Sequence, residues 1–147
     1  MIYVVDASVG VKWFIEEDYS ENADKLLEDF VDGRVDLVAP KSFMQEFCNA
    51  IRKYVVKSLL DRNLADKHVE KMAEIPIDYV DIDWDLVKES YAKALELSIT
   101  VYDAIYVVVA DKLKATIITS DDRLYNQLKD KVRILHIRDY RGNSNQK

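Results

Sequence analysis

The segment Ile2–Val5 is apolar at every position, without the alternation of apolar and polar residues found in strands with one face in water. A strand of this kind is buried on both faces, as in the parallel sheets of α/β proteins. The segments 35–39 and 116–118 are short and mostly apolar in the same way. Because parallel strands need long crossover connections, this feature predicts a sheet covered by helices on both sides.

Segments with apolar residues at helical spacing separate the strand-like segments. The spacing predicts helices over 23–31, 43–59, 61–75 and 84–95, and a shorter helix around Leu124 and Leu128. Further strands are predicted over 77–82 and 132–135. Gly33 ends the first helix, and Ser42 and Gln45 stand at capping-box spacing where the second begins. The alternating order predicts the α/β class with a central parallel sheet.

The segment 101–110 fits two structures. Its three consecutive valines favour a strand, whereas Thr100 and Asp103 match the spacing of a capping box and favour a helix. We predict the helix. The length of 147 residues suits one domain. We expect that domain over residues 1–138 and a polar C-terminal tail over 139–147.

Composition excludes several classes of protein. The single cysteine, Cys48, rules out an internal disulfide and a Cys-cluster zinc site, and we expect it to be packed as a small hydrophobe. Three glycines are too few for a P-loop or a dinucleotide fingerprint. The net charge of −6 counts against a general nucleic-acid coat protein. It leaves open a nucleic-acid enzyme, because metal ions can supply the missing positive charge.

The chain shows no sign of a targeting or membrane segment. The first residues lead directly to Asp6 without a basic stretch followed by an apolar one. The longest apolar run, 104–110, is far shorter than the ~20 residues that span a bilayer. We therefore expect a soluble, cytoplasmic protein that does not associate with a membrane.

Four acidic residues follow predicted strands or begin the next helix: Asp6, Glu46, Asp103 and Asp121. Ligands of open parallel sheets bind outside the carboxyl ends of the strands, so these residues are candidates for one site. A structural alternative exists for each, because 27 of 147 residues are acidic and acids favour helix starts. Asp103 is the hardest to explain that way, since it is the one charge within 101–110.

Convergent carboxylates repel one another unless a cation joins them. Mg²⁺ prefers oxygen ligands and commonly binds carboxylates together with a substrate phosphate. A site of this type activates water and stabilises the charge on the phosphoryl group under attack. The pattern therefore indicates metal-assisted hydrolysis of phosphodiester bonds.

Four motifs in this order resemble the PIN-domain ribonucleases, and within them the VapC toxins of VapBC toxin–antitoxin pairs. The motifs are Val5-Asp6-Ala7-Ser8, Pro40 with Glu46 and Asn49, Tyr102-Asp103-Ala104-Ile105-Tyr106, and Thr119-Ser120-Asp121. The resemblance runs from about Ile2 to Arg138. One minor departure is Ala115, where the family commonly has glycine.

The resemblance implies a three-layer α/β/α fold and a site that holds Mg²⁺ or Mn²⁺. The family's acidic quartet, which is both catalytic and metal-binding, maps onto Asp6, Glu46, Asp103 and Asp121. The T-x-D element of Thr119 and Asp121 favours Asp121 over its neighbour Asp122 as a metal ligand, while Thr119 and Asp122 are candidates for binding substrate or bracing the site. Ser8 and Asn49 match positions that line or brace the site. The family also implies cleavage of RNA, a homodimer, and a VapB-like antitoxin that wraps around the toxin and reaches into the site.

Basic residues are concentrated near one candidate acid. Arg52, Lys53, Lys57 and Arg62 lie on or just after the helix that carries Glu46, and Lys53 shares its face. A solvated helix surface would explain any one of them. Our hypothesis is that Lys53 contacts a substrate phosphate.

The residues thus favour a metal-dependent endoribonuclease, the toxin of a type II toxin–antitoxin system. One alternative is a receiver-type phospho-acceptor domain, which also gathers acids at strand ends. It fits less well, because Asp6 stands alone after its strand and no lysine follows the last strand. A second alternative is an inactive PIN scaffold that only binds protein, although such a module has no need of four mutually repelling carboxylates.

Overall fold

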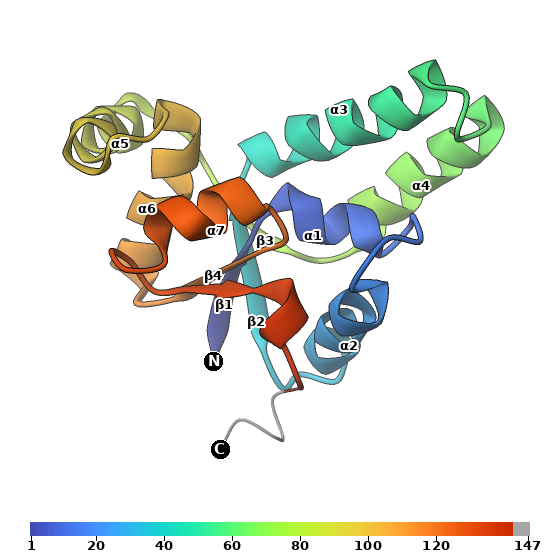
Figure 1. The fold of residues 1–147 in the computed structure, drawn as a ribbon, viewed down its shortest axis with the longest axis horizontal. Coiled ribbons are helices and arrows are strands. Elements are labelled where there is room, and N and C mark those ends of the chain that lie inside the picture. Colours follow the sequence, from blue (N-terminus) through green and yellow to red (C-terminus); the bar gives the residue numbers. More distant parts are fainter. Residues whose placement is uncertain (143–147) are drawn as a thin grey trace.

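The computed structural model describes residues 1–142, so the end of the predicted tail, 143–147, lies outside the described residues. A parallel sheet lies at its centre with strand order β3-β2-β1-β4-β5 (Figure 1). The strands are β1 (Ile2–Val5), β2 (Asp36–Pro40), β3 (Asp78–Val80), β4 (Thr116–Thr119) and β5 (Ile134–His136). This order differs from the 2-1-3-4-5 order of receiver-type domains, which excludes that alternative.

Helices connect successive strands as predicted, two in each of the first three connections and one between β4 and β5. They are α1 (Ala7–Lys12), α2 (Ser20–Val31), α3 (Ser42–Val56), α4 (Arg62–Glu74), α5 (Trp84–Leu97), α6 (Val101–Leu113) and α7 (Asp122–Leu128). A short 3-10 helix covers Ile137–Asp139. None of the helices described is both long and apolar enough to cross a membrane.

The sheet separates two apolar clusters, which gives the three layers α/β/α (Figure 1). On β1, Tyr3 and Val5 join the cluster that contains residues of α1 to α4, and Val4 joins the cluster of α5 to α7. Successive side chains of a strand point to opposite faces, so both faces of β1 must be apolar. That is why Ile2–Val5 is apolar throughout.

The segment 101–110 is helical, as the capping argument predicts. Thr100 is the N-cap of α6, and its hydroxyl accepts a hydrogen bond from the Asp103 backbone N–H at 3.1 Å. Seven consecutive residues of α6, from Ala104 to Ala110, are buried, so its valines pack around the helix rather than along a strand.

Two local predictions on α3 are wrong. Lys41 is the N-cap residue, with helical φ and ψ and no side-chain cap, so Ser42 already lies inside the helix and forms no capping box. Cys48 is exposed, because the buried side of α3 is formed by Phe43, Phe47 and Ile51.

The first part of the predicted tail is packed against the domain. Tyr140 is buried, and its ring lies edge-on to Tyr3 with centroids 5.8 Å apart. The Asn22 side chain donates hydrogen bonds to the carbonyls of Arg138 and Tyr140 at 3.3 and 3.0 Å. These contacts fix the chain beyond β5 against α2.

Candidate active site

Asp6 is held at the carboxyl edge of the sheet by the pairing of β1 with β4. Val5 pairs with Ile118, and the Asp6 backbone N–H donates to the Ile118 carbonyl at 3.0 Å. The same carboxylate oxygen, Oδ2, accepts hydrogen bonds from the hydroxyls of Ser8 at 2.6 Å and Thr119 at 2.8 Å. Because two donors converge on one oxygen, the orientation of the carboxylate is fixed before any ligand binds.

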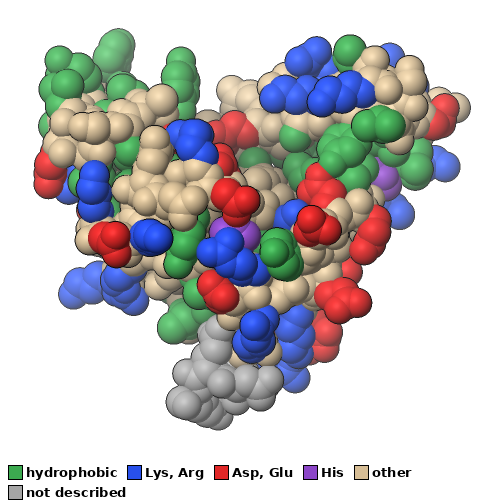
Figure 2. Space-filling model, viewed as in Figure 1, with side chains coloured by type: hydrophobic (Ala, Val, Ile, Leu, Met, Phe, Trp, Pro, Cys, Tyr) green, Lys and Arg blue, Asp and Glu red, His purple; other side chains and the backbone are tan. Residues whose placement is uncertain are grey.

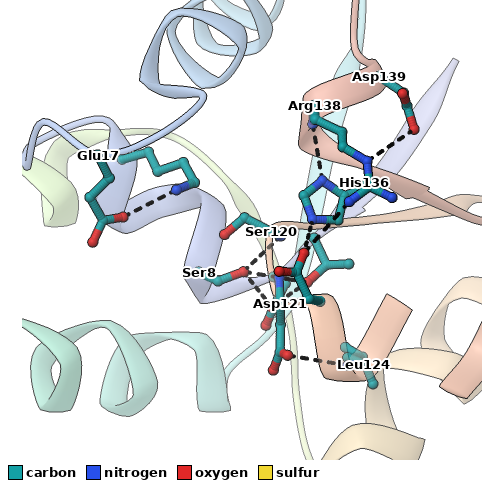
Figure 3. Close-up of polar contacts among 12 residues, drawn as sticks. Ser8, Glu17, Ser120, Asp121, Leu124, His136, Arg138 and Asp139 are labelled. Carbon is teal, nitrogen blue, oxygen red and sulfur yellow. Dashed lines mark hydrogen bonds and ion pairs between the residues drawn. The ribbon is translucent and has the colours of Figure 1, made fainter. Parts of the chain in front are cut away.

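The same hydroxyls connect Asp6 to the segment that carries Asp121. Ser8 accepts a hydrogen bond from the Ser120 backbone N–H at 3.0 Å, and Thr119 accepts one from the Asp121 backbone N–H at 3.0 Å. Figure 3 shows Ser8, Ser120 and Asp121 together where the strands end. Asp121 also caps α7, with Oδ1 accepting from the Leu124 backbone N–H at 3.2 Å. The capping role and a site role are thus compatible, because the second oxygen, Oδ2, makes no cap contact.

The positively charged side chain of Arg123 lies close to both Asp103 and Asp121. Nη2 of Arg123 lies 3.4 Å from Oδ2 of Asp103 and 3.6 Å from Oδ2 of Asp121. The Asp103 side chain is mostly shielded from solvent, at 20% exposure. A single guanidinium nitrogen therefore lies within reach of two carboxylates that come from different helix starts.

Glu46 enters the site from the second turn of α3. Its Oε2 accepts a hydrogen bond from the Tyr106 hydroxyl at 2.6 Å. Tyr106 lies on α6, one turn after Asp103, and is 2% exposed. The tyrosine therefore joins α3 to α6 and fixes the direction of the Glu46 carboxyl.

The carboxylates interact electrostatically. Burial raises the pKa of Asp6 above its ordinary value, and the charges of Asp121 and Asp103 raise it further. The hydrogen bonds from Ser8 and Thr119 act in the opposite direction. Burial also raises the pKa of Glu46 to about 7, with contributions from the charges of Asp6 and Asp103. All four predicted acids thus converge at one edge of the sheet.

The donor set matches a hard divalent cation in kind. Carboxylate oxygens are the ligands that Mg²⁺ and Mn²⁺ take, and a cation would relieve the repulsion that raises these pKa values. Within residues 1–142, no three His, Cys, Asp or Glu side chains are drawn together closely enough to hold a metal ion as they stand. Metal binding at this edge therefore requires the side chains to close in, and Arg123 lies between two of them.

Two of the candidate residues lie outside the carboxylate cluster. Asp122 contacts Nε2 of His136 at 2.8 Å and lies 3.6 Å from Nη1 of Arg138. This arrangement agrees with the T-x-D element, which favours Asp121. Asn49 is exposed on α3, and its Oδ1 accepts a hydrogen bond from Nε of Arg52 at 2.9 Å.

A groove of about 580 Å³ lies between α1 and α3 and adjoins the cluster. Its lining includes Ser8 and Ser120 at one end and three lysines, Lys12, Lys53 and Lys57. Lys12 is nearly buried and pairs with Glu17 at 3.3 Å, and the Tyr54 hydroxyl contacts the same glutamate (Figure 3 shows Glu17). Lys53 and Lys57 are exposed, and Figure 2 shows basic side chains gathered over α3. The lining also contains Glu17 and Asp18, so the accessible positive charge of the groove comes from Lys53 and Lys57.

Sequence reasoning missed two residues of the site. Tyr106 has the one-turn spacing from Asp103 that places both on one side of α6, but that spacing is equally typical of core aromatics. Arg123, on α7, has a weaker sequence signal because it is one of 21 basic residues. Its contact with Asp103 depends on where α6 lies relative to α7 in the folded chain.

We expect the metal-free protein to lose stability as pH rises from about 4.5 to about 7, because the folded state holds the Glu46 proton longer than the unfolded state. This stabilisation is complete below pH 4.5 and is lost as pH passes about 7. Solvent screens this half-buried group, so the loss should be about 1–2 kcal/mol in the free energy of unfolding. Urea unfolding with a chelator at pH 5 and pH 7.5 measures it.

Glu46→Gln should flatten this decline, and the exposed Glu70→Gln should keep it. Equal pH dependence in wild type and Glu46→Gln would show that Glu46 does not carry the effect.

The chain is similar to known proteins in both sequence and fold. The family model described as PIN domain matches residues 3–129. The sequence is 30% identical over 126 residues to Ribonuclease VapC3 of Pyrobaculum aerophilum, covering 84% of this chain and 92% of that protein.

Two solved structures share the fold. The crystal structure of PAE2754 from Pyrobaculum aerophilum matches with a TM-score of 0.69 and 21% identity, over 94% of this chain and 93% of that one. A toxin–antitoxin complex from Klebsiella pneumoniae matches with a TM-score of 0.65 and 16% identity, over 92% and 97%.

Proposed function

The chain belongs to the PIN-domain family, and we propose that it is a metal-dependent endoribonuclease that acts as the toxin of a VapBC-like pair. The observation that carries this proposal is the convergence of four carboxylates from four elements, with raised pKa values at Asp6 and Glu46. A purely structural role would not need mutually repelling acids at the ligand-binding edge of the sheet.

A bound Mg²⁺ or Mn²⁺ would lower the pKa of a water molecule and stabilise charge on the phosphoryl group under attack. We assign the metal-facing roles to Asp6, Asp103 and Asp121. Ser8 and Thr119 hold the Asp6 carboxylate in one orientation through hydrogen bonds of 2.6 and 2.8 Å. Asp121 presents Oδ2 while its other oxygen caps α7.

Glu46 is the proposed proton acceptor. A general base works best when its pKa lies near the operating pH, and burial together with neighbouring charge raises the pKa of Glu46 to about 7. The Tyr106 hydroxyl, 2.6 Å from Oε2, orients the carboxyl. Glu46 would accept a proton from the attacking water, and its negative charge would add to the attraction of the cluster for the metal.

RNA is the proposed substrate. The relative at 30% identity is named a ribonuclease, which supports this class of substrate. The groove beside the cluster adds support, because the exposed Lys53 and Lys57 line it and would attract a phosphate backbone. The experiment that tests the function is internal cleavage of RNA by the purified chain with Mg²⁺, with Asp6→Asn as the matched inactive variant.

Lys53→Ala should weaken RNA binding by about two- to fivefold and lower the slope of log affinity against log salt by about 0.7, which corresponds to one phosphate contact on a single strand. Lys53 is exposed on the groove wall, so the change should leave the fold intact. Fluorescence anisotropy at several salt concentrations measures both quantities. Lys67→Ala removes an exposed lysine of α4 that does not line the groove and should match wild type. An unchanged slope for Lys53→Ala would remove Lys53 from the phosphate-binding surface.

The proposed partners are a VapB-like antitoxin and a second copy of the chain. A structural neighbour is a toxin–antitoxin complex, which supports the first. An exposed apolar surface supports the second: Trp84, Tyr91 and Leu95 on α5 and Tyr102 on α6 are 60% to 77% exposed. Figure 2 shows this apolar surface over α5. Exposed apolar surface of this kind commonly marks a protein–protein contact.

A further inference from the structure

Arg123 occupies the position between two of the proposed metal ligands. Its Nη2 lies 3.4 Å from Asp103 Oδ2 and 3.6 Å from Asp121 Oδ2. In the part of the chain that the structure describes, no other lysine or arginine pairs with either carboxylate. The guanidinium therefore supplies the positive charge that these two acids share.

We propose that Arg123 is an internal counter-cation that competes with the divalent metal for Asp103 and Asp121. This inference rests on the proposed metal site. A guanidinium nitrogen bonds carboxylate oxygen at about 2.7–2.9 Å, whereas Mg²⁺ binds oxygen at about 2.0–2.1 Å. For both oxygens to approach one metal ion, the nitrogen between them must leave.

The contacts of Arg123 suit it to displacement. Both oxygen distances exceed those of a tight ion pair, and the side chain is 56% exposed. Pairs of this kind add little stability, so their loss costs little. The other end of the guanidinium already has a second partner, because Nη1 donates to Oε1 of Gln127 at 3.0 Å. Gln127 lies one turn further along α7, which gives the displaced side chain a place away from the acids.

The competition has two consequences. Without metal, Arg123 offsets the repulsion between Asp103 and Asp121, which lie at the starts of α6 and α7. With metal, part of the binding free energy is spent on releasing the arginine, which weakens the apparent metal affinity. Removing the guanidinium should therefore strengthen metal binding, the opposite of what is expected for a residue that helps to hold the ion.

The experiment compares Arg123→Gln with Arg62→Gln by titrating MnCl₂ and measuring free Mn²⁺ by electron paramagnetic resonance. Arg62 is an exposed arginine that pairs with Asp66 on α4, so its variant loses the same charge away from the site. We expect Arg123→Gln to bind Mn²⁺ about three- to tenfold more tightly than wild type, since the two long ion pairs of Arg123 no longer compete. Arg62→Gln should bind as wild type does.

A second measurement uses the unmodified side chain. In ¹H–¹⁵N spectra of wild type, the Nε–H signal of Arg123 should shift when MgCl₂ saturates the site, and the Arg62 signal should not. A static Arg123 signal, or equal or weaker Mn²⁺ binding by Arg123→Gln, would overturn the proposal and favour a role in holding substrate phosphate.

These outcomes are distinct from failure of the proposed function. Asp103→Asn should lose Mn²⁺ binding if the acids form the metal site. If wild type and Asp103→Asn bind Mn²⁺ equally, the metal site itself is wrong. If Asp103→Asn loses binding but Arg123→Gln gains none, only the competition is wrong.

Discussion

Asp6→Asn is expected to lower RNA cleavage by about 10²–10³-fold, the effect of removing one preorganised charge from a reaction centre. Asp6 is the most constrained of the four acids, because two hydroxyls and the β1–β4 pairing fix its position. Asparagine has the same shape but no negative charge. The loss therefore reports on charge and metal binding rather than on packing.

The fold should survive this substitution. The side-chain carbonyl oxygen of the new asparagine can accept the hydrogen bonds that Ser8 and Thr119 now donate to Oδ2 of Asp6. Burial and neighbouring acids raise the pKa of Asp6, so the charged form is disfavoured in the folded state. We accordingly expect the metal-free variant to melt at the same temperature as wild type or slightly higher.

The measurement is the rate of internal cleavage of a labelled RNA, with Asp85→Asn as the control. Asp85 is exposed near the start of α5, where it pairs with Lys88, and its variant should cleave as wild type does. If Asp6→Asn cleaved at the wild-type rate, the nuclease would be a contaminant or the site would lie elsewhere.

Removing divalent metal is expected to lower the rate of RNA cleavage by about 10²-fold or more, and adding Mg²⁺ or Mn²⁺ should restore it. RNA binding at the cluster should weaken as well, because four carboxylates without a cation repel phosphate. Because the net charge of the protein is −6, the rest of the surface attracts phosphate too weakly to offset this repulsion.

The test compares chelator-treated protein with protein to which Mg²⁺, Mn²⁺ or Ca²⁺ has been added back. Binding is followed by rapid-mixing fluorescence anisotropy, within the time before the RNA is cut. Full cleavage in chelator would exclude the metal mechanism. Binding that ignores metal while cleavage requires it would place RNA affinity in the lysine-lined groove rather than at the carboxylates.

The fold could be predicted because most of its elements have a local cause. Ile2–Val5 is apolar on both faces because helices cover both sides of the sheet. Thr100 favours the helix over the strand at 101–110 through a single cap contact. Asp6 and Asp121 could be placed at one edge because parallel strands bring their carboxyl ends together, whereas Asp103 was a candidate as the one charge at the start of an apolar helix.

The features that could not be predicted depend on how the elements pack together, which no local sequence pattern indicates. The missed capping box at Ser42 arose because Lys41 adopts helical dihedral angles directly after β2. Cys48 faces solvent because the phenylalanines of α3 determine which side is buried. The roles of Tyr106 and Arg123 follow from where α3, α6 and α7 meet, which is a property of the assembled domain.

The hydrogen bonds that hold Asp6 also bear on when activity can arise during synthesis. Ser8 and Thr119 are 111 positions apart in the chain, and Asp6 depends on both. Domains fold on the ribosome as their segments emerge. A nascent chain in which β4 has not emerged lacks Thr119, Asp121 and the strand that positions Asp6. If Asp6 and Asp121 form the active site as proposed, the nascent chain is expected to stay inactive beside the ribosome until most of its sequence has been made.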